Sequence, residues 1–322
     1  MHKVSPPPDG SYSSYVATPA KRHKRCWPIF TLGAVVANII VLVVVMYENN
    51  CPANIGYGRK CVLGSSFKRM SFQPWSENPL LGPSSATLQK MGGLRTDLVV
   101  DQKQGWRLMS CVWLHAGVFH LLVNMIALLV FGIELERDFG FIRIGLLYLI
   151  SGLGGSLLSS LFNHNAISVG ASGALFGLLG ATTSELITNW SRYRSRCSQL
   201  FQLIIVTGVN LAIGLLPRVD NFAHIGGFVT GFLLGFILLM KEQYRYVQRS
   251  TLLDPRMDPQ HVKRFKTYQF ILLLVSLLLL IAGFAGGFVA LYSGVDAYNR
   301  CSWCHYLNCV PSSHWTCDSQ SG

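Results

Sequence analysis

The sequence predicts an all-α, polytopic membrane protein, and three observations support this fold class. Of the 322 residues, 50% are hydrophobic and only 13% are charged, whereas soluble domains carry about 25% charged residues. Seven apolar runs each approach the ~20 residues that a bilayer-spanning helix needs. The basic residues behind the net charge of +12 cluster between these runs, as in loops that flank membrane helices. We therefore expect the lipid bilayer, and no nucleic acid, as a partner.

The apolar runs predict seven spanning helices, the last of which follows a six-helix core. The runs lie at 29–47, 110–131, 144–162, 171–188, 200–216, 222–240 and 269–293. The first run is too long for a cleaved signal peptide, and no small-residue cleavage site follows it.

The distribution of Lys and Arg predicts the orientation, because these residues concentrate on the cytoplasmic side of membrane proteins. It places the N-terminus in the cytoplasm and the C-terminus in the lumen. The predicted segments are a disordered basic N-terminus at 1–28, the helical core at 29–240 with a long lumenal first loop at 47–109, a basic cytoplasmic linker at 241–268, the seventh helix at 269–293 and a cysteine-rich lumenal tail at 294–322.

Six cysteines fall on the predicted lumenal side, and an even number in an oxidising compartment predicts disulfides. They are Cys51, Cys61, Cys301, Cys304, Cys309 and Cys317. Their spacing does not decide the pairing. The alternative is a zinc knuckle built on Cys301-x-x-Cys304 with His305 and His314, and the lumenal position of the tail favours disulfides over it.

Polar side chains within three of the runs are candidates for function, because such groups are costly inside a membrane. They are His115, His120 and Asn124 in the second run, Ser172 in the fourth and His224 in the sixth. His120 and Asn124 are four residues apart and share a helix face. From His120, Ser172 and His224 the next charge toward the cytoplasm is about 13 to 17 residues away, or about 20 to 25 Å along a helix. All three therefore lie at a similar depth in the lumenal half.

Glycines at helical spacing predict that the fourth and sixth runs pack closely, since small residues let membrane helices approach. These glycines are Gly173, Gly177 and Gly180 in one run and Gly227, Gly231 and Gly235 in the other. Packing along them would bring Ser172 to His224. The alternative is glycine-mediated packing with an incidental serine and histidine.

The chemistry of this pair favours acyl transfer. A serine hydroxyl becomes a strong nucleophile when a base such as His224 takes its proton. The developing oxyanion needs donors, which His120, Asn124 and the free N–H groups at a helix start can supply. Asp220 is expected to cap a helix rather than to form a third catalytic member. The G-x-S-x-G motif of soluble hydrolases is absent because residue 174 is alanine.

Five motifs in this order resemble the rhomboid family of intramembrane serine proteases over nearly all of 106–240. They are Trp106-Arg107, His120-x-x-x-Asn124 with His115 ahead of it, Gly132-x-x-x-Glu136-x-x-x-Gly140, Gly170-Ala-Ser172-Gly173 and Ala223-His224-x-x-Gly227. One position departs from the pattern: Phe176 stands where the family often has a tyrosine that packs on the histidine.

The resemblance implies a six-helix bundle with Ser172 as nucleophile, His224 as base, and His120 and Asn124 at the oxyanion. It implies supporting roles for His115, Gly170, Gly173, Phe176, Gly227, Trp106, Arg107 and Glu136. The seventh helix is similar to that of the secretory-pathway type, and the cysteine-rich tail is similar to that of plant members, which suggests the Golgi.

The predicted activity is cleavage of single-pass membrane proteins within or beside their transmembrane helices, with no metal or cofactor. A non-catalytic rhomboid-like protein that binds transmembrane helices and controls their trafficking is the main alternative. A transporter would predict inverted repeats, and the sequence has none.

Overall fold

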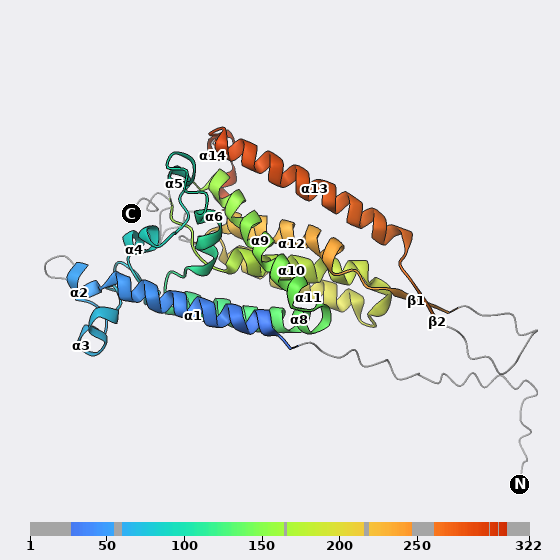
Figure 1. The fold of residues 1–322 in the computed structure, drawn as a ribbon, viewed down its shortest axis with the longest axis horizontal. Coiled ribbons are helices and arrows are strands. Elements are labelled where there is room, and N and C mark those ends of the chain that lie inside the picture. Colours follow the sequence, from blue (N-terminus) through green and yellow to red (C-terminus); the bar gives the residue numbers. More distant parts are fainter. Residues whose placement is uncertain are drawn as a thin grey trace, which may run out of the picture.

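The fold is almost entirely helical. The computed structural model describes residues 27–54, 60–163, 166–215, 219–246, 261–295, 297–301 and 303–307. The long elements labelled in Figure 1 are α1 (Ile29–Asn49), α7 (Val118–Ala127) with its continuation α8 (Ile133–Phe139), α9 (Phe141–Phe162), α10 (Ser172–Thr188), α11 (Arg196–Ile213), α12 (Asn221–Leu238) and α13 (Thr267–Tyr292).

The remaining elements are short. The short helices are α2 (Cys51–Asn54), α3 (Gly64–Phe67), η1 (Lys68–Met70), α4 (Ser85–Lys90), α5 (Thr96–Val100), α6 (Arg107–Ser110), η2 (Cys111–Trp113), the π-turn η3 (Leu128–Gly132) that joins α7 to α8, η4 (Trp190–Arg192), α14 (Ala297–Arg300) and η5 (Cys304–Leu307). Strands β1 (Gln243–Tyr246) and β2 (His261–Arg264) form one antiparallel hairpin. We call the end that carries residues 51–54 and 60–117 the loop end and the end that carries β1 and β2 the hairpin end (Figure 1).

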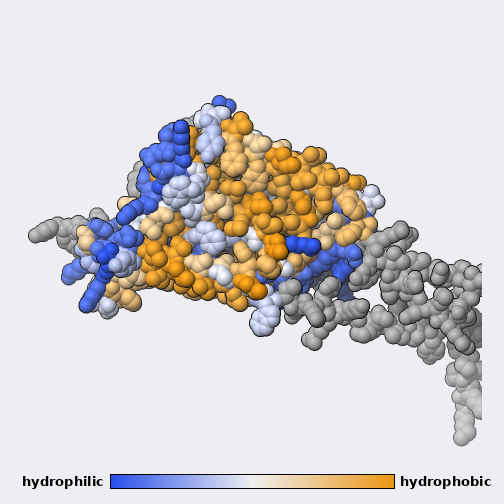
Figure 2. All heavy atoms as spheres, viewed as in Figure 1, coloured by the Kyte–Doolittle hydropathy of each residue, from blue (hydrophilic) through white to orange (hydrophobic). Residues whose placement is uncertain are grey.

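The all-α membrane fold predicted from the sequence is confirmed. Within the described residues, six helices are long and apolar enough to cross a membrane by length and composition. The seventh helical segment, α10, has 17 residues and lies among the others. Figure 2 shows an apolar surface over the helices and a hydrophilic surface at the loop end. Helices α9, α10 and α12 lie between α1 and α13, which occupy opposite edges of the view (Figure 1).

The second spanning helix begins later than the sequence predicted. The helix starts at Val118 and not at 110, because the chain before it is held against residues 80–82. The N–H groups of Val118 and Phe119 donate to the carbonyls of Leu81 and Leu80, at 2.9 and 3.3 Å. These bonds satisfy donors that a helix start leaves free, so 114–117 remain extended loop.

Helices α10 and α12 pack backbone to backbone, as the glycine spacing predicted. A Cβ atom placed on Gly227 would overlap the carbonyl of Gly173, and one placed on Gly231 would overlap the carbonyl of Gly177. No residue other than glycine fits such a contact without a shift of one helix. Because the two helices approach along these glycines, their first turns meet at the loop end.

A buried carboxylate fixes the start of α1 against α8. Glu136 is fully buried (0% exposed), and its carboxylate accepts hydrogen bonds from the N–H groups of Phe30 and Thr31, both at 2.7 Å, and from Thr31 Oγ1 at 2.6 Å. The negative charge also lies where the helix dipole of α1 is positive. Glu136 therefore joins two helices whose contact residues are 105 positions apart.

Replacing Glu136 with alanine is expected to lower the free energy of unfolding by about 3 kcal/mol, because three donors, two of them in buried hydrogen bonds, lose their charged acceptor. Thermal unfolding in detergent measures this change. The matched control is Glu134→Ala, an exposed carboxylate on the same helix, which should change stability by no more than about 0.5 kcal/mol. Equal losses in the two variants would contradict the assigned contact.

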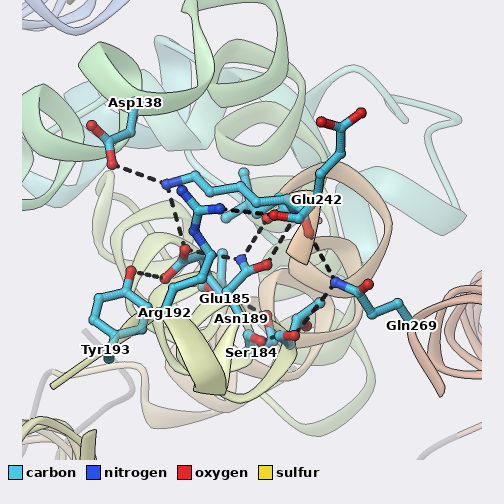
Figure 3. Close-up of polar contacts among 12 residues, drawn as sticks. Asp138, Ser184, Glu185, Asn189, Arg192, Tyr193, Glu242 and Gln269 are labelled. Atoms are coloured by element: carbon cyan, nitrogen blue, oxygen red, sulfur yellow. Dashed lines mark hydrogen bonds and ion pairs between the residues drawn. The ribbon is translucent and has the colours of Figure 1, made fainter. Parts of the chain in front are cut away.

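A polar network ties α13 to the core at the hairpin end (Figure 3). Gln269 is fully buried and donates to the carbonyl of Lys241 at 3.0 Å, while the hydroxyl of Tyr268 donates to the carbonyl of Thr188 at 2.6 Å. Asn189 donates to Glu185 and to the carbonyl of Leu239, at 3.0 and 3.1 Å. The network therefore holds α10, the end of α12 and the start of α13 together.

The same network has a charged part. Lys241 Nζ lies 3.1 Å from Asp138 and 3.6 Å from the buried Glu185. The Tyr193 hydroxyl donates to Glu185, and burial together with this carboxylate raises the pKa of Tyr193 above its ordinary value. The tyrosine therefore stays a neutral donor.

Two disulfides lie at the loop end. Cys51 pairs with Cys61 and Cys301 with Cys304. The other two predicted disulfide cysteines, Cys309 and Cys317, lie outside the described residues, as does the N-terminal segment 1–26.

Candidate functional site

Ser172 and His224 meet at the loop end, where the first turns of α10 and α12 come together. His224 Nε2 lies 2.9 Å from Ser172 Oγ. Ser172 is the first residue of α10, and His224 lies in the first turn of α12 with 7% of its surface exposed. A serine–histidine contact of this length lets the imidazole accept the hydroxyl proton.

The loop that leads to Ser172 is fixed from two sides. Ser168 pairs with Leu94 through two backbone hydrogen bonds of 3.0 Å, and the N–H of Gly170 donates to the carbonyl of Cys111 at 2.9 Å. Gly170 has a φ of +132°, and a Cβ there would lie 2.8 Å from the His120 ring. The backbone angle and the close ring both require glycine at this position.

His120 offers a hydrogen-bond donor beside the serine loop, and Asn124 lies one turn later on the same helix. His120 Nδ1 accepts from the N–H of Ala116 at 3.3 Å, which fixes the tautomer and leaves the proton on Nε2. His120 Nε2 lies on the ring edge nearest Gly170. Asn124 is buried, and its Nδ2 has no hydrogen-bond partner among the described residues. Both groups are therefore free to donate to a bound oxygen.

His115 lies in the loop before α7 and not within the second spanning helix. The helix starts three residues later, for the reason given above. Its ring packs edge-on against His120 with 5.2 Å between centroids, and it is fully buried. His115 therefore supports the position of His120 and does not reach Ser172 through any contact that the structure shows.

Phe176 stacks on the His224 ring. The centroids are 4.3 Å apart and the planes are 12° from parallel. Phe176 lies one helical turn after Ser172 on α10, so the helix that carries the serine also orients the imidazole. The position that departs from the resembled motif thus keeps its ring contact.

Asp220 caps α12, as the sequence predicted. One carboxylate oxygen accepts from the N–H of Ala223 at 3.1 Å, and the other accepts from Ser159 Oγ on α9. Ser159 was missed in the sequence because nothing in its local pattern marks it. The carboxylate does not bond to His224, and His224 Nδ1 has no hydrogen-bond partner within the described part of the chain.

Arg107 and Trp106 lie in the loop end and support it at a distance from the pair. Arg107 NH1 donates to the carbonyls of Gln89 and Gly93, at 2.6 and 2.8 Å, and burial lowers its pKa below the ordinary value, although a guanidinium stays charged. Its guanidinium lies 4.9 Å from the centroid of the exposed Trp106 ring. Since Gly93 precedes the residue that pairs with Ser168, these contacts reach the serine loop.

The arrangement of these residues suits acyl transfer. It combines a nucleophile, a base in contact with it and, near Gly170, a histidine ring that can donate a hydrogen bond. Among the described residues, no group of three or more His, Cys, Asp or Glu side chains is arranged to hold a metal ion.

Comparisons with known proteins agree with the motifs. Residues 102–241 match the sequence profile of the Rhomboid domain. RHOMBOID-like protein 1 of Arabidopsis thaliana is 54% identical over 92% of this chain and 76% of its own length, and RHOMBOID-like protein 4 is 55% identical over 93% and 74%. Inactive RHOMBOID-like protein 8 of the same plant is 39% identical over 89% of this chain and 82% of its own length.

Proposed function

The chain belongs to the rhomboid family, and on that premise we propose that it is a serine endopeptidase that cleaves single-pass membrane proteins in or beside their transmembrane helices. The observation that carries the proposal is the 2.9 Å contact between Ser172 Oγ and His224 Nε2. In the proposed orientation, the N-terminus is cytoplasmic and the loop end faces the lumen of a secretory compartment, for which we propose the Golgi.

The proposed reaction has two halves. Ser172 Oγ attacks the scissile carbonyl while His224 Nε2 takes its proton, and the imidazolium then protonates the leaving amine. His120 Nε2–H, the Asn124 amide and the N–H of Ser172 hold the oxyanion. Water then hydrolyses the acyl-enzyme with the same base. The chemistry needs no metal or cofactor.

The histidine is oriented without a carboxylate. Asp220 is already used as the cap of α12, so stacking on Phe176 takes the orienting role. In such a dyad, packing places the base. The ring of Phe176 and the glycine contact between α10 and α12 therefore both help to position His224 against Ser172.

The substrate must expose a carbonyl, and a transmembrane helix hides its carbonyls in its own hydrogen bonds. We therefore propose substrates whose helices unwind readily near the lumenal surface, with small or helix-breaking residues at the cleavage site. Ser172 and His224 lie at the loop end of the apolar bundle. We therefore propose that contacts between the substrate's transmembrane helix and the bundle select the substrate.

Reconstitution into proteoliposomes with a panel of single-pass substrates tests the proposal. Cleavage should give two fragments, and mass spectrometry should place the cut near the lumenal end of the substrate helix. One relative is named inactive, and for a chain without protease activity we propose one other function, which is binding of transmembrane helices without cleavage. If intact substrates co-purify stably with the protein and no substrate in the panel gives fragments, binding without cleavage is the function instead.

Replacing Phe176 with alanine is expected to lower kcat about 2- to 10-fold, because an aromatic stacking contact contributes about 0.5–1.5 kcal/mol. Phe176→Tyr should retain wild-type kcat within about twofold, since the ring is kept. Steady-state cleavage of one reconstituted substrate measures both. A loss in Phe176→Tyr as large as that in Phe176→Ala would show that the ring contact is not what orients His224.

A further inference from the structure

Asn221 links three separate segments at the start of α12. It is the first residue of that helix, and its side chain is buried, with 2% exposed. Its Nδ2 donates to the carbonyl of Leu307 at 2.7 Å and to the carbonyl of Leu211 at 3.2 Å. One amide group thus bonds to the end of α11 and to a residue 86 positions later in the chain.

The tail segment, residues 297–301 and 303–307, contains a disulfide shortly before this contact. The segment consists of α14, the Cys301–Cys304 disulfide and η5. Cys304 is buried, and its N–H donates to the carbonyl of Cys301 at 3.3 Å. The disulfide closes a single turn, and this turn leads into η5, whose last residue is Leu307. Helix α14 packs on α9, so the tail segment is anchored on both sides of the disulfide.

The same first turn of α12 carries His224. Asp220 ties this turn to Ser159 of α9, and Asn221 ties it to α11 and to the tail segment. The N–H groups in the first turn of a helix have no partners within the helix, so external contacts add to what holds this turn in place. The imidazole reaches Ser172 from this turn, and small displacements of a catalytic group cost large factors in rate.

We propose that Asn221 is a positioning residue that couples the disulfide-closed tail segment to the placement of His224. The tail segment lies against the start of α12 as a strap, and the hydrogen bond from the Asn221 amide to the Leu307 carbonyl attaches it there. The effect on catalysis rests on the proposed protease function, whereas the attachment itself does not.

The kinetic test compares Asn221→Ala and Asn221→Asp with the matched control Asn210→Ala. Asn221→Asp keeps the shape of the side chain and removes both N–H donors. Asn210 also donates to a backbone carbonyl, but within its own helix and at an exposed position. We expect kcat to fall about 5- to 20-fold in both Asn221 variants with KM within twofold, and no change in the control. A rise in KM alone, or an effect in Asn221→Ala that Asn221→Asp does not share, overturns the positioning role.

The coupling to the tail segment is tested in the full chain by opening the disulfide with Cys301→Ser and Cys304→Ser together. This double substitution should lower kcat in the same range, and adding Asn221→Ala to it should lower kcat by less than twofold more, because both changes release the same attachment. If the disulfide substitutions and Asn221→Ala lower kcat independently, so that their fold changes multiply, the proposed coupling is wrong. If Asn221→Ala does not fold, an unchanged kcat in the disulfide variant overturns the proposal by itself.

A readout that needs no catalysis separates this proposal from the protease assignment. Arg300 is exposed and lies within the tail segment, so trypsin cleavage after it reports release of the strap. In a Ser172→Ala background in detergent, Asn221→Ala should speed this cleavage at least about fivefold, whereas Asn210→Ala should not. Equal rates overturn the attachment. If Asn221→Ala speeds trypsin cleavage but the wild-type protein cleaves no substrate, the proposed attachment is supported and only the protease function is contradicted.

Discussion

Replacing Ser172 with alanine is expected to lower substrate cleavage by about 10⁴-fold or more, since loss of the nucleophile removes most of the rate enhancement of a serine protease. Within the described part of the chain, the side-chain hydrogen bond of Ser172 Oγ is the one to His224. The substitution should therefore leave the midpoint of thermal unfolding unchanged or slightly raised, because sites built for chemistry are seldom optimised for stability. Substrate binding should persist, because the oxyanion donors and the bundle are intact.

The measurement is cleavage of a reconstituted substrate at equal protein concentration, with thermal unfolding as the second readout. Ser184→Ala is the matched control, since Ser184 lies on the same helix and donates to the carbonyl of Ala181 far from the pair. It should cleave at the wild-type rate. Wild-type product levels from Ser172→Ala would mean that another nucleophile acts, and the assignment of the site would be wrong.

Replacing Gly231 with alanine is expected to lower the free energy of unfolding by about 3 kcal/mol and to reduce cleavage at least tenfold, because overpacking a closely fitted contact forces the backbone to shift. The added Cβ would overlap the carbonyl and Cα of Gly177, and backbone atoms have no rotamer with which to yield. Helices α10 and α12 would separate or slide, and their first turns carry Ser172 and His224. A shift of this kind acts on stability and on the catalytic contact together.

Gly283→Ala is the control for this substitution, because a Cβ at Gly283 in α13 meets nothing within 4 Å. It should leave cleavage unchanged and raise stability by up to about 1 kcal/mol, since alanine is the better helix former. Unfolding in detergent and cleavage in proteoliposomes check both variants. Stability and activity that stay at wild-type values in Gly231→Ala would show that the helices do not pack as closely as the structure shows.

The sequence predicted the contact between the two central site residues correctly but predicted the start of the second helix wrongly. The meeting of Ser172 with His224 followed from three local facts, namely depth, glycine spacing and chemistry, and the structure brings these two side chains into contact. The start of the second helix was predicted wrongly: the mostly apolar residues 110–117 hold the end of α6, the short helix η2 and a loop, and the first N–H groups of α7 donate to the carbonyls of Leu80 and Leu81. Apolar sequence alone does not distinguish a buried loop from a helix.

The sequence by itself determined the class of this protein, its seven helical segments and the residues of its candidate site. It could do so because a bilayer has a fixed thickness and because helical spacing places residues three or four apart on one face. Only the tertiary structure decided what supports that site. Ser159 bonds to Asp220 across 61 positions and Asn221 to Leu307 across 86, and each link depends on single polar atoms that meet after the helices have packed. Such contacts leave no periodic signal in the chain. Once the fold exists, burial strengthens each hydrogen bond and makes an unpaired polar atom costly, so the specific partner matters.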